Sequence, residues 1–335
     1  MGRFTVGSFN LRNLVRPGVP YYGREGDSPR EVQRKQVWIG RQLDNMRAEI
    51  VGVQEVFHAD ALAGAVERSR MGRHNATVHV SEREGDDGPL PSVGLVTTLP
   101  VKRCEFIESF PSAGCLQLSE GANPVDRFSR PVLRAEIELP TGPTVVVFVV
   151  HLKSKRPEML DGEDEHDPMH RATGKARSLI RRASEAIALR HLLVEALHDT
   201  DTPVMVMGDL NDAGGAVTSD IITGSPPWGR LPERQKQALW DVLLYNVKDI
   251  QARQSHKDVY YTHLHNGHYD ALDHILVSQE FSRGNRRGIG HVEYVQVLND
   301  HLVDRTLARR KTPRWHSDHG LVVATFKLYE PSKTR

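Results

Sequence analysis

The feature that most constrains the fold of this chain is an almost uninterrupted apolar run at residues 144–150, TVVVFVV. β-Branched and aromatic residues of this kind favour strands. A strand with one face in solvent would alternate apolar and polar residues, so this run predicts a central strand that is covered on both faces. The fold must therefore place further layers on each side of a sheet, and 335 residues suffice for such a core.

Strand-like and helix-like segments alternate over the rest of the chain. Ser28 is a good helix N-cap, because Pro29 follows at the first helical position and Glu31 completes a capping box. Asp60 is expected to cap a second helix that runs to about residue 70, and a long helix is predicted at 175–197. Further strands are predicted at residues 4–9, 50–53, 93–98, 103–110, 132–139, 204–207, 272–277 and 321–328. This alternation indicates the α/β class.

Two long polar loops interrupt the alternation, at residues 17–27 and 156–174. Neither is expected to be a domain linker, because strands on both sides of each loop are needed to complete one core. The sequence therefore predicts a single domain over residues 1–335. The acidic run 161–167 lies in the second loop, and because it lacks apolar residues we expect it to be solvated and mobile.

Composition and charge exclude several classes of protein. The formal net charge is +1, so no overall field draws the chain to nucleic acid or acidic lipid. The two cysteines, Cys104 and Cys115, are too few for a disulfide framework and do not form a CxxC pair. The sequence does not begin with a signal peptide, and no apolar run reaches the ~18 residues of a membrane helix. We expect a cytoplasmic protein that does not insert into membranes and has no obligate protein partner.

Polar residues that packing would not select follow the predicted strands. They are Asn10, Glu55, His151, Asp209 with Asn211, and Asp273 with His274, and a further group, Ser317, Asp318 and His319, precedes the last strand. The ends of strands are rigid positions on which catalytic residues are often mounted. The sequence therefore predicts that these side chains form one polar site.

The residue types in this set suit phosphoryl chemistry. Carboxylates and amides without cysteine favour Mg²⁺ or Mn²⁺ over zinc. Metal-assisted phosphoryl transfer also needs a positioned water and cationic donors to the phosphate, which histidine and arginine provide.

Ordinary structural interpretations stand beside the chemical one. Asn10, Glu55, Asp209, Asn211 and Asp273 could form turns or caps, His151 could be a core histidine, and Arg130 could be a surface ion-pair partner. We expect a purely structural role for His274. His263 and His265 would share one face of a strand, but no further ligands follow at zinc spacing, so a polar strand near the site is the simpler expectation.

Six short motifs spread over almost the whole chain carry a family resemblance. They are Ser8-Phe9-Asn10, Val53-Gln54-Glu55, His151-Leu152-Lys153, Gly208-Asp209-Leu210-Asn211, Leu272-Asp273-His274-Ile275 and Ser317-Asp318-His319. In this order they resemble the signature of the endonuclease–exonuclease–phosphatase superfamily, the group built like deoxyribonuclease I. Phe128-Ser129-Arg130-Pro131 is similar to the arginine segment of the deoxyribonuclease I branch. The resemblance implies a four-layer α/β sandwich, with two packed mixed β-sheets flanked by helices, and hydrolysis of a phosphoester with Mg²⁺ or Mn²⁺.

The resemblance also implies which residues hold the metal and the attacking water. Glu55 would bind the metal ion, with Asn10 close by and Asp318 helping to hold it. Asp209 and Asn211 would orient the attacking water. Asp209 is our choice for the group that takes the proton from this water, although the Asp273–His319 pair is the alternative.

The remaining residues of the resemblance would act on the phosphate. His319 would lie against it and be oriented by Asp273 through the other ring nitrogen. His151 and Asn211 would contact phosphate oxygens, and Arg130 and Thr262 are further phosphate-binding candidates.

Basic clusters give the only indication of the substrate. They are Lys153, Lys155 and Arg156, then Arg171, Lys175, Arg177, Arg181 and Arg182, and then Arg305, Arg309, Arg310, Lys311 and Arg314. If they flank the site they would grip an anionic backbone, which favours DNA or another nucleic acid, but such runs are also ordinary solvated surface. Aromatic residues are not interleaved with these runs, so stacking of single strands is not expected. The alternatives are a small-molecule or lipid head-group phosphoester and a catalytically inactive binding module.

Overall fold

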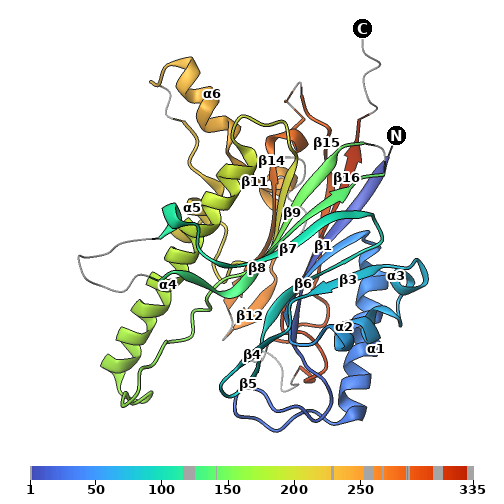
Figure 1. The fold of residues 1–335 in the computed structure, drawn as a ribbon, viewed down its shortest axis with the longest axis vertical. Coiled ribbons are helices and arrows are strands. Elements are labelled where there is room, and N and C mark those ends of the chain that lie inside the picture. The colour runs from blue at the N-terminus through green and yellow to red at the C-terminus, as the bar shows by residue number, and fades with distance from the viewer. Residues whose placement is uncertain are drawn as a thin grey trace.

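The computed structural model describes residues 2–115, 125–140, 142–227, 230–252, 260–265, 268–283, 285, 287–304 and 312–329. Within them, two β-sheets pack face to face and helices lie on the outside (Figure 1). The predicted α/β class and the four-layer sandwich are confirmed. The predicted basic residues Arg305, Arg309, Arg310 and Lys311 lie outside the described residues.

Six strands form the first sheet. Their bounds are β1 (Arg3–Leu14), β2 (Ile50–Val56), β3 (Thr77–Val80), β6 (Ser92–Thr97), β15 (Gly290–Leu298) and β16 (Leu321–Leu328). The order across the sheet is β15-β16-β1-β2-β6-β3. β1 and β2 run parallel, and the other neighbours are antiparallel.

The second sheet repeats this pattern. Its strands are β7 (Val101–Ser109), β8 (Arg127–Glu138), β9 (Thr144–His151), β10 (Val204–Asp209), β11 (Leu244–Asn246) and β14 (Asp273–Ser278). The order is β11-β14-β10-β9-β8-β7, with β9 and β10 parallel and the other neighbours antiparallel. Two small ribbons complete the strands: β4 (Arg83–Gly85) with β5 (Gly88–Leu90), and β12 (His263–His265) with β13 (His268–Asp270).

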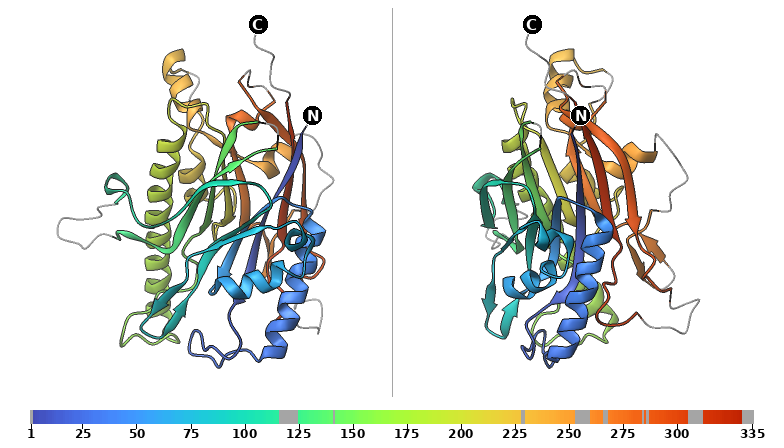
Figure 2. Two further views of the ribbon diagram at one scale, coloured as in Figure 1. Left: turned by 45° about the vertical axis from the view of Figure 1, so that its right-hand side comes forward. Right: turned by 90° about the vertical axis from the view of Figure 1, so that its right-hand side faces the viewer.

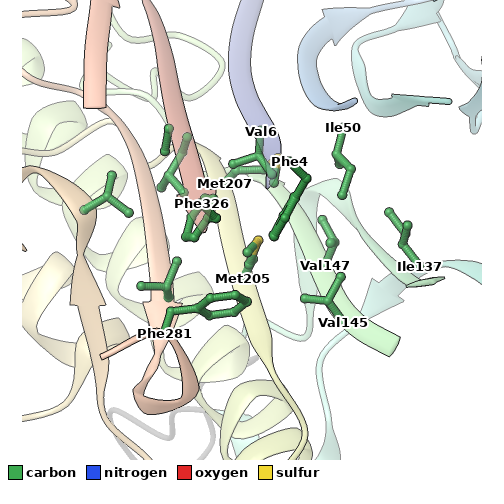
Figure 3. Close-up of a cluster of buried hydrophobic side chains, with 14 of the residues drawn as sticks. Phe4, Val6, Ile50, Ile137, Val145, Val147, Met205, Met207, Phe281 and Phe326 are labelled. Atoms are coloured by element: carbon green, nitrogen blue, oxygen red, sulfur yellow. The ribbon is translucent and has the colours of Figure 1, made fainter. Parts of the chain in front are cut away.

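The apolar run at residues 144–150 lies in β9, and its side chains face two different cores. Val145, Val147 and Val149 belong to the core between the sheets, whereas Val146, Phe148 and Val150 belong to the core beneath the helices. The core between the sheets is shown in Figure 3, where Phe4 and Phe326 of the first sheet meet Met205 and Met207 of the second. The prediction of a central strand covered on both faces is confirmed.

Helices cover the outer face of each sheet (Figure 2). The bounds are α1 (Pro29–Met46), α2 (Ala59–Val66), α3 (Arg70–Arg73), α4 (Pro168–Leu197), α5 (Val217–Thr223), α6 (Glu233–Asp241) and α7 (Val247–Ala252), with short 3₁₀ turns at Ser112–Gly114 and Gln279–Phe281. α1 and α2 pack on the first sheet, and α4 packs on the second. Among the described helices, none is both long enough and apolar enough to cross a bilayer.

The predicted N-cap of the first helix is confirmed, and that of the second is wrong. Ser28 caps α1 and forms the predicted capping box with Glu31. Asp60 does not cap α2: the N-cap is His58, and Asp60 instead binds the Arg16 guanidinium at 2.7 Å. The predicted helix to about residue 70 was also wrong in length, because α2 ends at Val66 and a separate turn, α3, follows.

The acidic loop is hydrogen-bonded to the helix that follows it. Asp167 is the N-cap of α4, which therefore begins at Pro168 rather than at the predicted residue 175. Glu163 forms two hydrogen bonds with Arg177 of α4, each 2.7 Å long. The loop is thus tied to the helix that follows it, and most of residues 161–167 are exposed to solvent, as expected.

Strand positions were predicted better than strand ends. β16 has the predicted bounds, but β1 continues to Leu14 instead of ending before Asn10. The pairing of β1 with β2 shifts register between Asn10 and Leu14, so the strand is irregular where the site begins. β15 was not predicted at all.

Candidate active site

The ends of both parallel strand pairs meet at one end of the sandwich. Asn10 lies opposite Gln54 in β1 and β2, and His151 lies opposite Asp209 in β9 and β10. The antiparallel neighbour β14 begins with Asp273 directly opposite Asp209. β16 is antiparallel to β1, so the residues just before it also lie at this end.

His319 and Asp273 form a buried pair. Nδ1 of His319 and Oδ2 of Asp273 are 2.8 Å apart, and Nε2 of His319 lies 3.9 Å from Oδ2 of Asp209. Burial acts to lower the pKa of His319, but the negative charges of Asp273 and Asp209 outweigh it and raise that pKa well above the usual value. The ring is therefore a charged donor, with Nδ1 held by Asp273 and Nε2 directed to the site.

Asp209 is the carboxylate that the other groups surround. Burial raises its pKa to about 7, and the charge of His319 opposes this rise. Its Oδ1 accepts the backbone N–H of Asn211 at 2.8 Å, and its Oδ2 accepts Nδ2 of Asn10 at 3.2 Å. A carboxylate with this pKa changes protonation state near neutral pH, as a general base must.

His151 approaches Asp209 from β9. Nε2 of His151 lies 3.6 Å from Oδ2 of Asp209. Burial, together with the charges of Arg130 and His319, lowers the pKa of His151 well below its usual value. His151 is therefore a neutral ring beside a charged His319, and both rings face the Asp209 carboxylate at distances longer than a hydrogen bond.

Asn10 joins the two halves of the site. Its Nδ2 donates to Oε1 of Glu55 and to Oδ2 of Asp209, both at 3.2 Å. Its Oδ1 accepts the backbone N–H of Arg12 at 2.9 Å, which fixes the orientation of the amide because an N–H must face an oxygen. Asn10 thus turns its nitrogen, not its oxygen, to the carboxylates, and this geometry does not fit the predicted role of a metal ligand.

Glu55 and Asp318 are the more open carboxylates of the site. Glu55 has φ 58°, a left-handed conformation that non-glycine residues rarely adopt. Strain of this kind concentrates at functional sites. The Asp318 side chain is 47% exposed and lies 3.4 Å from Nε of Arg12.

Arg12 and Lys35 support this part of the site and were missed from the sequence. Arg12 and Asn13 have φ 53° and 61°, and Nζ of buried Lys35 binds the carbonyl oxygens of both. Arg12 in turn holds Asp318 and donates to the carbonyl oxygen of His316 at 3.2 Å. The available signal was a lysine at a core-facing position of α1, since Val32, Lys35 and Ile39 share the helix face that packs on the sheet.

Arg130 and Asn211 converge on the carbonyl oxygen of Leu152, beside His151. Nη1 of Arg130 lies 3.3 Å from this oxygen, and Nδ2 of Asn211 lies 3.0 Å from it. Glu185 of α4, 1% exposed, accepts the backbone N–H of Ser129 at 2.8 Å and that of Lys153 at 2.6 Å. This buried glutamate, also missed from the sequence, ties the Arg130 segment to the His151 segment.

Thr262 and His274 prove to be supporting residues. Oγ1 of Thr262 accepts the backbone N–H groups of Leu272 and Asp273, and the side chain is fully buried, so contact with a phosphate does not fit the geometry. Nε2 of His274 donates to the carbonyl oxygen of Asp212, and Nδ1 pairs with Asn246, as its expected structural role requires. His263 lies on β12 with its ring 5.0 Å from that of His319, so the predicted polar strand does lie near the site.

Glu55 and Asp318 are better suited to bind a divalent metal ion than the buried carboxylates Asp209 and Asp273 are. Asp209, Asp273 and His319 form a tight group with ligand atoms within 4.8 Å of one another, but Nδ1 of His319 is already bound to Asp273. Glu55 and Asp318 offer oxygens with more access to solvent, and carboxylate oxygens with open positions for water are what Mg²⁺ and Mn²⁺ prefer. The buried group is therefore a hydrogen-bonded network, and the oxygens of Glu55 and Asp318 are the better metal ligands.

The basic residues that follow His151 are mostly paired within the protein. Lys155 and Arg182 both pair with Asp212, at 3.2 and 3.4 Å. Arg177 pairs with Glu163, and Arg181 pairs with Glu158. These two clusters hold α4 and its preceding loop in place, so their cations are less available to a substrate than the sequence indicated.

The comparisons with known proteins agree with the family resemblance of the motifs. The model of the Endonuclease/Exonuclease/phosphatase family matches residues 7–319. The chain belongs to this family. Enzymes of the endonuclease/exonuclease/phosphatase family are hydrolytic phosphoesterases that use a divalent metal ion, so the protein is placed among the hydrolases. No curated protein matches the chain by sequence.

Solved structures share the fold of the family. The catalytic domain of human Nocturnin with bound sulfate is 14% identical, with a TM-score of 0.59 over 98% of this chain and 94% of that one. The mannosyl-6-phosphatase of Bacteroides thetaiotaomicron is 16% identical, with a TM-score of 0.55 over 97% and 100%. Truncated Caenorhabditis elegans TDP2 is 15% identical, with a TM-score of 0.53 over 97% of each chain. At these identities the likeness shows the fold alone.

Proposed function

We propose that this phosphoesterase is a Mg²⁺- or Mn²⁺-dependent nuclease that hydrolyses phosphodiester bonds of DNA or another nucleic acid. The observation that carries the chemistry is the position of Asp209. Asn10, Glu55 and the segment with His319 approach it from the first sheet, and Asp273 and His151 lie beside it in the second. A base, a charged donor and open oxygen ligands then surround one place where a phosphate can bind.

Each residue has a defined task in this proposal. Asp209 takes the proton of the attacking water at a carboxylate oxygen, which its pKa of about 7 allows. His319, held by Asp273, donates from Nε2 to a phosphate oxygen and stabilises the charge that develops there. A divalent metal ion at Glu55 and Asp318 would activate the phosphorus for attack and neutralise the leaving oxygen.

The surrounding residues hold this constellation in place. Asn10 sets the spacing between Glu55 and Asp209, and Asn211 fixes Asp209 through its backbone N–H. Arg130 contacts the carbonyl oxygen of Leu152, next to His151, and both side chains would contact the phosphate.

A small phosphoester is the second candidate substrate. The observation that favours it is the internal pairing of the cations that follow His151, since Lys155, Arg177, Arg181 and Arg182 each pair with a carboxylate of the protein. The mannosyl-6-phosphatase shows that the fold accommodates such a substrate.

Cleavage of supercoiled plasmid separates the two candidates. Wild type should nick the plasmid with Mg²⁺ or Mn²⁺, EDTA should stop the reaction, and Asp209→Ala should be at least ~100-fold slower, as expected for loss of a general base. Asp199→Asn, at a side chain that is 86% exposed, is the matched control and should keep full activity. If no metal supports nicking while phosphate is released from small esters, the nuclease proposal fails and the second candidate replaces it.

A further inference from the structure

A surface pocket of about 450 Å³ lies between α1 and the segment that leads to Asp318. Its lining includes the side chains of Arg30, Arg34, Arg41, Trp38, Trp315 and His316. Its volume is within the range of about 300–1,000 Å³ that ligand pockets occupy. α1 begins at the same end of the molecule at which β1 enters the active site (Figure 1).

Aromatic rings form one wall of this pocket, and two of them lie on the segment that leads to Asp318. Trp38 stacks on His316, with ring centroids 4.9 Å apart, and meets Phe9 edge-on at 5.8 Å. Arg12 binds both the carbonyl oxygen of His316 and the carboxylate of Asp318, so the segment that lines the pocket is anchored at the proposed metal ligand. Trp315 is three residues from Asp318, a stretch of chain that spans at most about 10 Å. A ligand in the pocket would therefore lie next to the site of hydrolysis.

Cations that lack carboxylate partners form the rest of the lining. Arg30, Arg34 and Arg41 are exposed on one face of α1, and none of them forms an ion pair with a carboxylate of the described residues. Arg34 lies over the ring of Trp315, 5.6 Å from its centroid. Glu31, the acidic neighbour in the first turn, is engaged by Ser28 in the capping box. The contrast with the paired cations of α4 is clear, because here the guanidinium groups remain available for an external anion.

Resting on the proposed nuclease function, we propose that this pocket binds an unpaired nucleic-acid strand beside the scissile phosphate. A nucleobase stacks against the Trp315 and Trp38 wall, and the strand's phosphates pair with Arg30, Arg34 and Arg41. Proteins that bind single strands combine an aromatic surface for the bases with a positively charged track for the backbone. Guanidinium planes and indole rings both stack on bases, so Arg34 over Trp315 forms a single platform.

The sequence pointed away from this conclusion. Trp315 and the arginines of α1 are far apart along the chain, and the basic runs that follow His151 contain no aromatic residue. The fold brings them together because α1 packs on the sheet whose neighbouring loop carries Trp315 and His316.

Binding of a fluorescein-labelled ten-nucleotide oligothymidylate, measured by anisotropy in EDTA, tests the proposal without catalysis. Trp315→Ala should weaken binding by ~5- to 150-fold, the loss expected for one stacked base. Trp315→Phe should restore most of the affinity, because stacking needs a ring rather than an indole. Arg34→Gln should weaken binding and lower the slope of log affinity against log salt by ~0.7, as expected for one lost phosphate contact on a single strand.

Two control variants lie outside the pocket. Trp240→Ala removes a tryptophan of α6 that is 40% exposed, and α6 lies far from α1 in Figure 1. Arg73→Ala removes an exposed arginine of α3 that does not line the pocket. Both should bind the oligonucleotide as wild type does. Equal loss in Trp240→Ala and Trp315→Ala, or no loss in Trp315→Ala, would overturn the proposal, as would equal competition by inorganic phosphate and by unlabelled oligonucleotide.

Combining the binding assay with the plasmid assay shows whether the pocket proposal or the proposed nuclease function fails. If wild type nicks plasmid but Trp315→Ala binds the oligonucleotide as tightly as wild type does, the pocket proposal fails and the nuclease stands. If wild type binds the oligonucleotide through Trp315 but nicks no plasmid, the pocket stands and the nuclease fails.

Discussion

The two sheets of the sandwich have the same local topology but end in different ways. Each has a central parallel pair with an antiparallel strand on either side, and each pair brings two polar residues to the same end of the molecule. β9 and β10 remain in register up to His151 and Asp209. β1 and β2 lose register at Asn10, and Arg12, Asn13 and Glu55 all adopt left-handed conformations.

The difference shows how one framework serves two chemical tasks. A regular strand end keeps Asp209 almost fully buried, where low solvation raises its pKa and allows proton transfer near neutral pH. A distorted strand end turns Glu55 out of the sheet, where its oxygens remain available to a hydrated cation. We therefore expect mutations at the regular end to affect the chemical step and mutations at the distorted end to affect the use of metal.

The largest effect is expected at the regular end. Asp209→Asn should reduce the rate by about 10²- to 10⁴-fold, because the water loses its general base. The loss should be the same at low and at high Mg²⁺ concentration, as a titration of plasmid nicking against Mg²⁺ would reveal. Recovery of the activity at high Mg²⁺ would show that Asp209 acts chiefly as a metal ligand and would remove the distinction between the two ends.

A smaller effect of a different kind is expected at the distorted end. Glu55→Gln should raise the Mg²⁺ concentration for half-maximal activity by at least about tenfold, as losses around metal sites usually do. Saturating Mg²⁺ or Mn²⁺ should then restore much of the rate. If the maximal rate falls as far as in Asp209→Asn and Mg²⁺ does not restore it, Glu55 takes part in the chemical step itself.

The backbone at Gly208, directly before Asp209, should not tolerate a side chain without loss of stability. Gly208 has φ +147°, and an added Cβ would lie 2.0 Å from the carbonyl oxygen of Val150. Gly208→Ala should therefore lower the free energy of unfolding by about 1–3 kcal/mol or more, as strained backbone positions do. Gly215→Ala is the matched control, because no atom lies within 4 Å of its added Cβ. Denaturant titration of the two variants measures the difference, and equal stability would mean that β10 can shift to accommodate a side chain.

The sequence predicted the regular end of the site better than the distorted end. Residues 144–150 and 204–207 are apolar strands with a polar residue after them, so the positions of His151 and Asp209 followed from pattern alone. The distortion after Asn10 did not, because it depends on Lys35, which lies on a helix and binds two carbonyl oxygens of β1. Contacts of this kind join residues that are distant in sequence, and periodicity carries no information about them.

The sequence also did not predict how individual side chains of the site are oriented. The motif placed Asn10 at the site, but only the backbone N–H of Arg12 decides that the amide presents nitrogen to the carboxylates. The same holds for Thr262, whose hydroxyl accepts two backbone N–H groups instead of facing the substrate. The residue types of a site could be read from the sequence, and their hydrogen-bond partners could not.

The smallest expected effect is a shift in the pH profile that reports on the buried network. Asp209 can act as a base only when it is ionised, so activity should rise with pH through the pKa of this group, which is about 7 in the absence of metal. A bound divalent cation would move this limb to lower pH, because positive charge favours the carboxylate. The charge of His319 also lowers the pKa of Asp209.

His319→Gln should therefore move the acidic limb to higher pH by about one unit, which corresponds to about 1.4 kcal/mol of lost charge interaction. The profile of kcat/KM for plasmid nicking, compared between wild type and the variant at saturating Mg²⁺, measures the shift. The overall rate of the variant will be lower, but only loss of the charge, and not loss of a phosphate contact, moves the limb. A limb that stays in place would mean that Asp209 is not the group whose ionisation starts the reaction, and the buried end of the sandwich would then have to act through Asp273 and His319 as the base.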